Sequence, residues 1–332
     1  MLRYLVSRVL QAALVVVGVA TVVFILEHLL PGDQGHIMLG PRVGPAQWAI
    51  YDHQNGLDEP IPVQYLAFLG NLMHGRIAFT PPGFADQINP IEGLPVDLDL
   101  RSLVMGPMIN SLILTGLSTL LVVAGTVPIA LYEAARRRRR GAHLSNITSM
   151  TLYSIPPFLL GTLLILMLSS DLHWLNLNAP DWTTGDVLAD PAALILPTLT
   201  LAIGTVALFS RYLRASTVEE LAKDYITTAR AKGASRSRVS LRHALPNASL
   251  PIITLLGTRL PQIFGAQLIV EVLFGYPGLG TTLWNAAMNR DFYTMLGAIL
   301  IGGVLTVVGS LITDLVYACV DPRIRYVRAR EG

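Results

Sequence analysis

Charged residues, cysteine and lysine are scarce in this chain of 332 residues, and each scarcity excludes a class of protein. Charged residues make up 14% of the sequence, against about 25% in soluble domains, which leaves too little polar surface to cover a water-soluble globule. The single cysteine, Cys319, excludes an internal disulfide and any metal site built from several cysteines. The chain is instead 52% hydrophobic with a mean hydropathy of +0.53, and this composition predicts a membrane protein.

Motifs for catalysis, nucleotide binding and metal binding are also missing. A P-loop ends in Lys followed by Ser or Thr, whereas the two lysines here, Lys223 and Lys232, precede Asp and Gly. No two of the seven histidines stand four residues apart, and Gly-x-Ser-x-Gly does not occur. The sequence therefore predicts a protein without catalytic, cofactor-binding or metal-binding residues of its own.

Six stretches are long and apolar enough to cross a hydrocarbon core of about 30 Å as helices. The predicted spans are residues 10–30, 108–132, 147–170, 192–210, 250–273 and 294–320. The third is expected to kink at Pro156 and Pro157, since each proline removes a backbone donor. The fifth is the weakest, because it holds Arg259 and Pro261. The predicted fold is an all-α integral membrane protein with six transmembrane helices.

Basic residues predict the orientation, because cytoplasmic connections carry an excess of Lys and Arg. With both termini on one side, that side holds nineteen of the 24 Lys and Arg, so both termini are expected in the cytoplasm. Five of these are the arginines at 136–140. We interpret this run as a topology determinant in contact with membrane lipid. It is not interpreted as a nucleic-acid site, because no aromatic residues are interleaved with it.

The connections between spans divide the chain into two predicted parts. Residues 1–107 comprise the first span and a long extracytoplasmic segment, in which 62–74 has helical periodicity. Residues 108–332 comprise a five-helix core that includes the cytoplasmic connection 211–249.

The connection 211–249 is polar but helical in pattern. Ser216 and Glu219 predict a capping box that opens a helix. One face of that helix is apolar, formed by Val218, Leu221, Ala222, Tyr225 and Ala229. Gly233 is expected to close this helix, Ser235 to cap a second, and Pro246 to end it.

The charges of this hairpin permit two interpretations. Glu219 and Lys223 are spaced to form an ion pair at i, i+4. By composition alone, the segment is either a helical hairpin hanging below the membrane or a solvated loop lying on the bilayer surface.

Two charged residues fall within the fifth span, Arg259 and Glu271. Ionisable residues inside a membrane are candidates for function, because leaving them unpaired costs several kcal/mol. Their separation of twelve residues, about 18 Å along a helix, is too long for a direct pair. Helix packing and a role in a solute pathway both remain open for them.

The hairpin resembles the cytoplasmic signature loop of permease subunits of bacterial ATP-binding-cassette importers. That signature is Glu-Ala-Ala, three residues, Gly, nine residues and Ile-x-Leu-Pro. The matching positions are Thr227, Thr228, Ala229, Gly233, His243, Leu245 and Pro246. The spacing fits without a gap, while the first two positions and the Ile position differ.

Further motifs are similar to the B-type permease of the dipeptide, oligopeptide and nickel branch of that family. They are MLRYLVSRVLQ at the start, LPGD at 30–33, residues 56–75, VEVLFGYPGLG at 270–280, NRDF at 289–292 and DPRIRY at 321–326. The chain departs from the branch at 75–78, where GRIA replaces Gly-Asp-Leu-Gly, and matches it only loosely over 80–107.

The resemblance implies the type I importer permease fold in the inner membrane of a bacterial cell. It implies four kinds of partner: a second homologous permease, two ATP-binding-cassette ATPase subunits that use ATP, an extracytoplasmic solute-binding protein, and membrane lipid. Peptides are the expected solute, with nickel chelates, haem, glutathione-like peptides or oligosaccharides as other candidates.

The resemblance also implies roles for particular residues. The ATPase-coupling loop would comprise Tyr225, Thr227, Thr228, Ala229, Arg230, Gly233, His243, Leu245 and Pro246. Glu271 and Arg259 are candidates for the pathway or a gate. The main alternative is a self-sufficient secondary carrier or channel, which would transport solute alone. An intramembrane enzyme lacks a catalytic constellation, and a membrane anchor would not explain the spaced loop.

Overall fold

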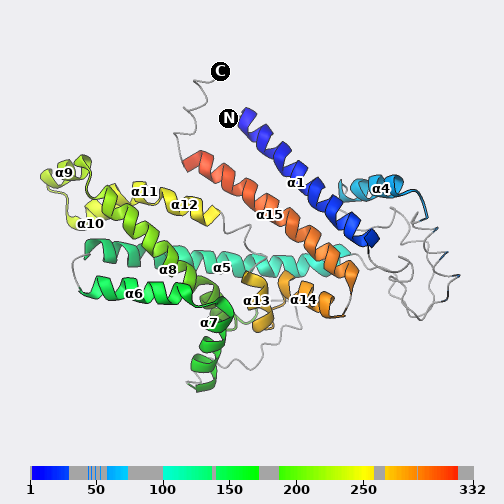
Figure 1. Cartoon of the computed structure of the whole chain (residues 1–332). Helices are drawn as coiled ribbons and strands as arrows, with labels where there is room; N and C mark the ends of the chain where they lie inside the picture. The colour runs from blue at the N-terminus through cyan, green and yellow to red at the C-terminus, as the bar shows by residue number, and fades with distance from the viewer. Residues whose placement is uncertain are drawn as a thin grey trace. The chain divides into compact units, whose positions relative to one another are not determined.

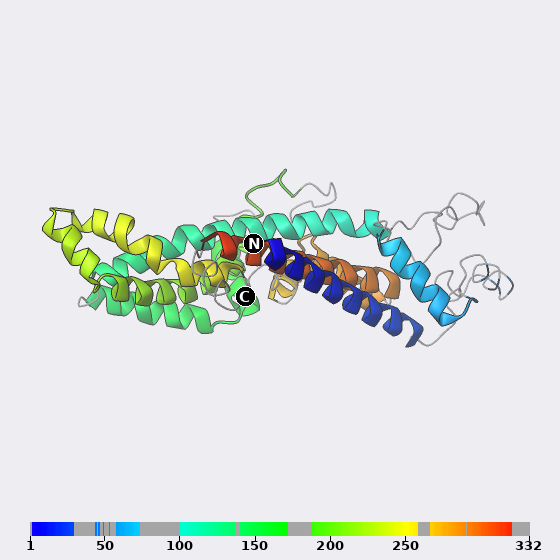
Figure 2. The same cartoon turned by 90° about the horizontal axis from the view of Figure 1, so that it is seen from above.

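The computed structural model describes residues 2–29, 44, 46, 49, 53, 58–73, 100–136, 140–171, 187–257, 266–289 and 291–320. Every regular element within these residues is a helix. Figure 1 labels the helices in chain order, and Figure 2 shows them from above. The all-α fold class predicted from the long apolar stretches is therefore confirmed.

Four helices of the described part are long and apolar enough to cross a membrane. They are α1 (Leu2–Leu29), α5 (Leu100–Ala135), α8 (Ile195–Glu220) and α15 (Phe292–Val320). They coincide with the first, second, fourth and sixth predicted spans. The bent pair described next brings the number to as many as five.

The third predicted span is a pair of helices rather than one kinked helix. Helix α6 (Arg140–Ser154) is followed by α7 (Pro157–Leu164), and the two meet at 106°. The break falls where Pro156 and Pro157 both lack a backbone donor, and Pro157 then occupies the first position of α7, where no donor is needed. A π-helical turn, η1 (Ile165–Asp171), continues α7. The predicted position of the bend, at Pro156 and Pro157, is therefore confirmed, but the chain breaks there into two helices.

The fifth predicted span is only partly described. Its two ends are α12 (Leu250–Gly257) and α13 (Ala266–Leu273). The residues between them, including Arg259, lie outside the described part of the chain. The count of six spans therefore stays a prediction.

Helix α8 extends ten residues beyond the predicted end at Ser210. The hydropathy pattern ends where Arg211 begins a polar stretch, but the buried face continues through Leu213 and Thr217. A buried face that repeats at i, i+3, i+4 and i+7 is enough to keep residues 211–220 helical, although the other faces of this part of the helix are charged. At 1.5 Å per residue the extension is about 15 Å long, and the helical hairpin follows it.

The chain separates into two compact units, each with its own core. One unit comprises Met1–Val9, Ile109–Thr281 and Leu305–Gly332. Its largest core cluster joins α5, α8, α11 (Leu245–Ala248) and α12 through Val122, Ala130, Ala202, Phe209, Leu213, Ala248 and Ile252. A second cluster holds Leu114, Val187, Leu194 and Tyr276.

The other unit comprises Leu10–Met108 and Thr282–Val304. Helix α4 (Ile61–Met73) lies here, close to the predicted helix at 62–74, and packs on α1 and α15. The buried residues of this packing are Ala20, Val23, Phe24, Phe68, Leu296 and Leu300. The predicted division at residue 107 concerns membrane topology rather than packing, and it stays a prediction.

Candidate functional site

The hairpin after α8 is built around a short helix, α9 (Asp224–Ala231). Its N-cap is Lys223 in an extended conformation, and Asp224 in the first turn suits the positive end of the helix dipole. The predicted capping box is wrong, because Ser216 and Glu219 both lie inside α8. Burial of the α8 stripe on either side of them outweighs a local signal of about 1 kcal/mol.

The second leg of the hairpin is a series of short turns. These are α10 (Arg236–Arg238), the π-helical turn η3 (Val239–Ala244) and α11. Ser235 caps α10 as predicted, since its hydroxyl accepts a hydrogen bond from the Arg238 amide at 3.4 Å. Pro246 does not end the helix, contrary to the prediction. It lies in the first turn of α11, where a missing donor costs nothing.

A small apolar cluster holds the two legs together, and we call it the hairpin core. Its buried members are Ile226, Val239 and Ala244, and Leu221, Ala229 and Ala234 pack against them. Ile226 is 0% exposed. Sequence reasoning missed this residue because a helix starting at 216 carries a different inner face from one starting at 224. The signal available was that Ile226 is the only large aliphatic residue of α9.

Gly233 ends α9 as predicted. Its φ of 82° lies in the left-handed region that favours glycine. The Gly233 amide donates to the Arg230 carbonyl at 2.9 Å, and the Ala234 amide donates to the Ala229 carbonyl at 3.1 Å. This pair of bonds is the Schellman motif. A Cβ added at Gly233 would meet no atom within 4 Å, so backbone conformation alone requires the glycine.

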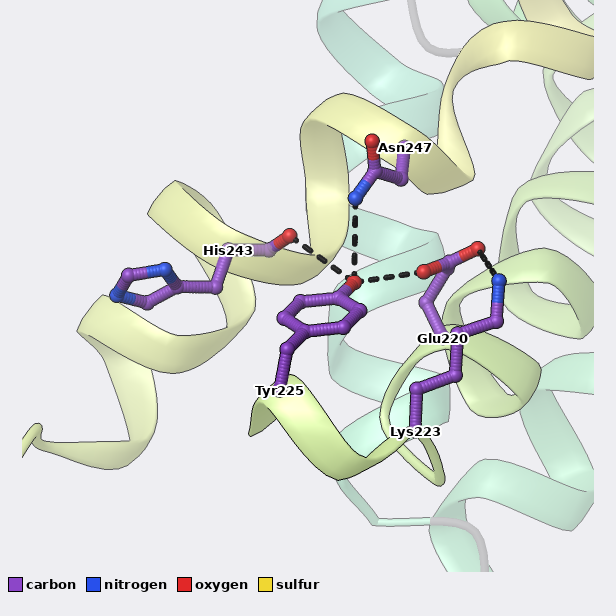
Figure 3. Close-up of polar contacts among 5 residues, drawn as sticks. All are labelled: Glu220, Lys223, Tyr225, His243 and Asn247. Carbon is purple, nitrogen blue, oxygen red and sulfur yellow. Dashed lines mark hydrogen bonds and ion pairs between the residues drawn. The ribbon is translucent and has the colours of Figure 1, made fainter. Parts of the chain in front are cut away.

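Five polar residues form what we call the Tyr225 cluster: Glu220, Lys223, Tyr225, His243 and Asn247 (Figure 3). The Tyr225 hydroxyl lies 2.6 Å from Oε2 of Glu220 and 3.3 Å from the His243 carbonyl, and it accepts a bond from Nδ2 of Asn247 at 3.2 Å. Nζ of Lys223 lies 2.5 Å from Oε1 of Glu220. The cluster therefore joins the end of α8, the start of α9 and the second leg.

The lysine of this cluster pairs differently from the prediction. Lys223 contacts Glu220 rather than Glu219, because α8 ends at Glu220 and the pair spans the turn into α9. The hydrogen bond to Glu220 raises the pKa of Lys223. Burial, and then the bond to Glu220, raise the pKa of Tyr225, so its hydroxyl keeps its proton at neutral pH and remains a donor.

The structure separates the predicted coupling residues into two groups. Ala229, His243 and Leu245 are partly buried, Ala229 in the hairpin core and Leu245 against the largest core cluster. The imidazole of His243 points away from Tyr225 (Figure 3). The exposed group is Tyr225, Thr227, Thr228, Arg230, Gly233 and Pro246. Threonine and arginine side chains of α9 therefore face outward, while Ile226 and Ala229 hold the helix.

The structure describes one of the two candidate residues for the solute pathway. Arg259 lies outside the described residues. Glu271 is on α13 and is 1% exposed, with its carboxylate facing Ser111, Gln267 and the start of α14 (Leu279–Asn289). In the part of the chain that the structure covers, no three His, Cys, Asp or Glu are grouped to hold a metal ion.

Comparison with known proteins places this architecture in a family. Residues 126–326 match the model described as the inner membrane component of binding-protein-dependent transport systems, and residues 1–86 match the N-terminal model of the same membrane component. The oligopeptide transport system permease protein AppB of Bacillus subtilis is 34% identical over 328 residues, which is 98% of this chain and 100% of the relative. The glutathione transport system permease protein GsiC of Salmonella paratyphi A is 32% identical over 327 residues, with the same coverage of both chains. The resemblance drawn from the motifs is thus confirmed, and the chain belongs to the family of inner-membrane components of binding-protein-dependent transport systems.

Proposed function

We propose that this chain forms half of the solute pathway of an ATP-driven importer and that ATPase subunits drive it through α9. The observation that carries the proposal is the construction of α9. Its inner side is held by Ile226, its end is closed at Gly233, and its outer side presents Thr227, Thr228 and Arg230. A short helix held so firmly with a free polar face is suited to docking on a partner.

The energy for import would come from that partner. The sequence has no P-loop, so ATP binding and hydrolysis are assigned to two separate ATP-binding-cassette subunits, and this chain is assigned no catalytic step. A second homologous permease would complete the pathway. A solute-binding protein would deliver the solute to the extracytoplasmic segment, since the family is that of binding-protein-dependent transport.

The hairpin provides a route for force from α9 into the membrane. The Tyr225 cluster connects the start of α9 to Glu220, the last residue of α8. Helix α8 continues for 26 residues into the core that it shares with α5 and α12. A movement of the docked α9 is therefore transmitted to α8, and through α8 to the helices that would line the pathway.

The proposed solute is a peptide. The relatives are named for transport of oligopeptides and of glutathione, and both solutes are peptides. The proposed location is the bacterial inner membrane with both termini in the cytoplasm, which puts α9 on the side where ATP is available.

A photo-crosslinking amino acid at Thr227 tests the docking role in native membranes. Thr227 is exposed on α9, and Thr151, an exposed threonine of α6, is the matched control position. We expect the Thr227 probe to crosslink to a protein that mass spectrometry identifies as an ATP-binding-cassette ATPase, and the Thr151 probe not to do so. Crosslinks from Thr227 to lipid alone would contradict the proposal and favour a loop lying on the bilayer.

A further inference from the structure

The first three backbone amides of α14 are bound by side chains from other helices. The amides at a helix N-terminus have no partner within the helix. Here the Leu279 amide donates to Oγ of Ser111 at 2.8 Å. The Gly280 and Thr281 amides donate to Oε2 of Glu271 at 2.7 and 3.4 Å. Glu271, on α13, thus acts as the N-terminal cap of a different helix.

The other oxygen of Glu271 binds α5 and its own helix. Oε1 accepts hydrogen bonds from Oγ of Ser111 at 2.6 Å and from Nε2 of Gln267 at 2.9 Å. Gln267 is itself held by α5, because Thr115 donates to its oxygen at 2.7 Å and its nitrogen donates to the Ser111 carbonyl at 2.9 Å. Four donors therefore surround one carboxylate that is almost fully buried.

The turn between α13 and α14 is attached to α5 at two further points. The Tyr276 hydroxyl donates to the Asn110 carbonyl at 2.8 Å, and Nδ2 of Asn110 donates to the Pro277 carbonyl at 2.9 Å. Tyr276 is completely buried. Gly275, with a φ of 59°, ends α13 and allows the chain to turn back toward α5.

Two glycines let the turn approach the carboxylate. A Cβ on Gly278 would overlap the carboxyl group of Glu271. A Cβ on Gly280 would lie 2.6 Å from Cα of Leu268 and 2.8 Å from Oε2 of Glu271. Both positions therefore require glycine. In the sequence GYPGLG at 275–280, these two glycines leave room for the carboxylate of Glu271.

We propose that Glu271 is a positioning residue that fixes the 274–281 turn and the first turn of α14 to α5. We call Ser111, Gln267, Glu271 and the amides of 279–281 the Glu271 clamp. The Glu271 carboxylate accepts hydrogen bonds from four donors of the protein and lies at the N-terminal, positive end of the α14 dipole. Glu271 thus acts by making α5, α13 and the turn one rigid body, and it does not contact solute. This proposal requires only the family, not the docking role of α9.

Hydrogen exchange of the full-length protein in nanodiscs tests the clamp. Amides at the start of a helix ordinarily exchange fast, but those of 279–281 are expected to be protected. Glu271→Gln keeps the size of the side chain and places an NH2 group against two donors. We expect these amides to exchange about tenfold faster or more, while the buried stretch of α8 keeps its protection.

Asp291→Asn is the matched control. Asp291 accepts a bond from the Thr294 amide at 3.1 Å at the start of α15 and takes no part in the clamp. This variant is expected to speed exchange at Thr294 and to leave 279–281 unchanged. Exchange of 279–281 at the parent rate in Glu271→Gln would overturn the proposal and return Glu271 to the pathway candidates.

A double-mutant cycle separates positioning from general stability. Ser111→Ala removes a smaller part of the clamp and is expected to speed exchange of 279–281 by a smaller factor. If the two residues act through one clamp, the double variant exchanges more slowly than the product of the two single effects predicts. Multiplying effects would overturn the proposal. Loss of α8 protection in Ser111→Ala would also overturn it, and this result can be measured even where Glu271→Gln fails to accumulate in the membrane.

Discussion

Replacing Ile226 by alanine removes the side chain that joins the two legs of the hairpin. Ile226 is fully buried and packs with Val239 and Ala244. Truncation of a buried isoleucine to alanine destabilises a core by about 2–5 kcal/mol. The hairpin core has only three fully buried residues, so it can collapse partly into the cavity that the truncation leaves. We therefore take about 2 kcal/mol, the lower end of this range, as the destabilisation. The population of hairpins with α9 detached should then rise by roughly thirtyfold, since 1.4 kcal/mol is a factor of ten.

Limited trypsin digestion of the purified chain in detergent measures this population. The hairpin carries cleavage sites at Arg230, Lys232 and Arg236, and cleavage through a transiently open state follows the opening equilibrium when reclosing is fast. Ile226→Ala should be cut up to about thirtyfold faster at these sites, whereas Thr227→Ala, exposed on the same helix, should be cut at the parent rate. Equal rates for parent and Ile226→Ala would refute the packing argument for α9.

Further predictions concern the Tyr225 cluster, the end of α9 and the Glu271 clamp. Tyr225→Phe removes the bonds to Glu220 and Asn247 and should destabilise the docked hairpin by about 1–2 kcal/mol, seen as faster trypsin cleavage and a lower crosslink yield from Thr227. The raised pKa of Tyr225 means that its bond to Glu220 is fully present below the unfolded pKa of about 10 and is lost as pH rises through the higher folded value. The ratio of the Tyr225→Phe cleavage rate to the parent rate should therefore stay constant from about pH 7 to about pH 9, and a ratio that falls toward one in this interval would contradict a protonated donor. Gly233→Ala should destabilise the hairpin by about 1 kcal/mol, because alanine is strained at the left-handed φ of this position. Gly233→Asp, or deletion of 227–233, should abolish uptake while membrane insertion is retained. Normal uptake by either variant would exclude the coupling role. Gly278→Ala should sharply reduce the yield of folded protein in fluorescence size-exclusion chromatography, whereas an added Cβ at Gly106 meets nothing and should be tolerated.

Sequence reasoning succeeded where the signal was local or repeated. Spans of about 20 apolar residues and the paired prolines at 156 and 157 produce their structural effect without help from distant residues. The same holds for Gly233 and Ser235, whose roles depend only on the backbone of their own turn. The spacing of the signature loop added the family, which composition alone does not give.

The errors arose where tertiary packing outweighed a local pattern. The capping box at Ser216 failed because the stripe containing Leu213 and Thr217 is buried and extends α8 through it. Displacement of the helix start then hid Ile226, although the helix end was predicted correctly. The bond between Ser111 and Glu271 joins residues 160 positions apart, and no pattern in a single sequence links them. Glu271 could be singled out as a buried acid, but its partners could not.

Isolation of the tagged chain from detergent-solubilised native membranes, with identification of its partners by mass spectrometry, tests the central claim most directly. We expect a second permease of the same family and an ATP-binding-cassette ATPase to be recovered, and we expect the purified complex to hydrolyse ATP. The Ile226→Ala variant should recover less ATPase while the second permease is retained, because α9 would be held less firmly. A chain that is isolated alone and still moves a peptide across liposome membranes without ATP would contradict the claim and identify a carrier or channel.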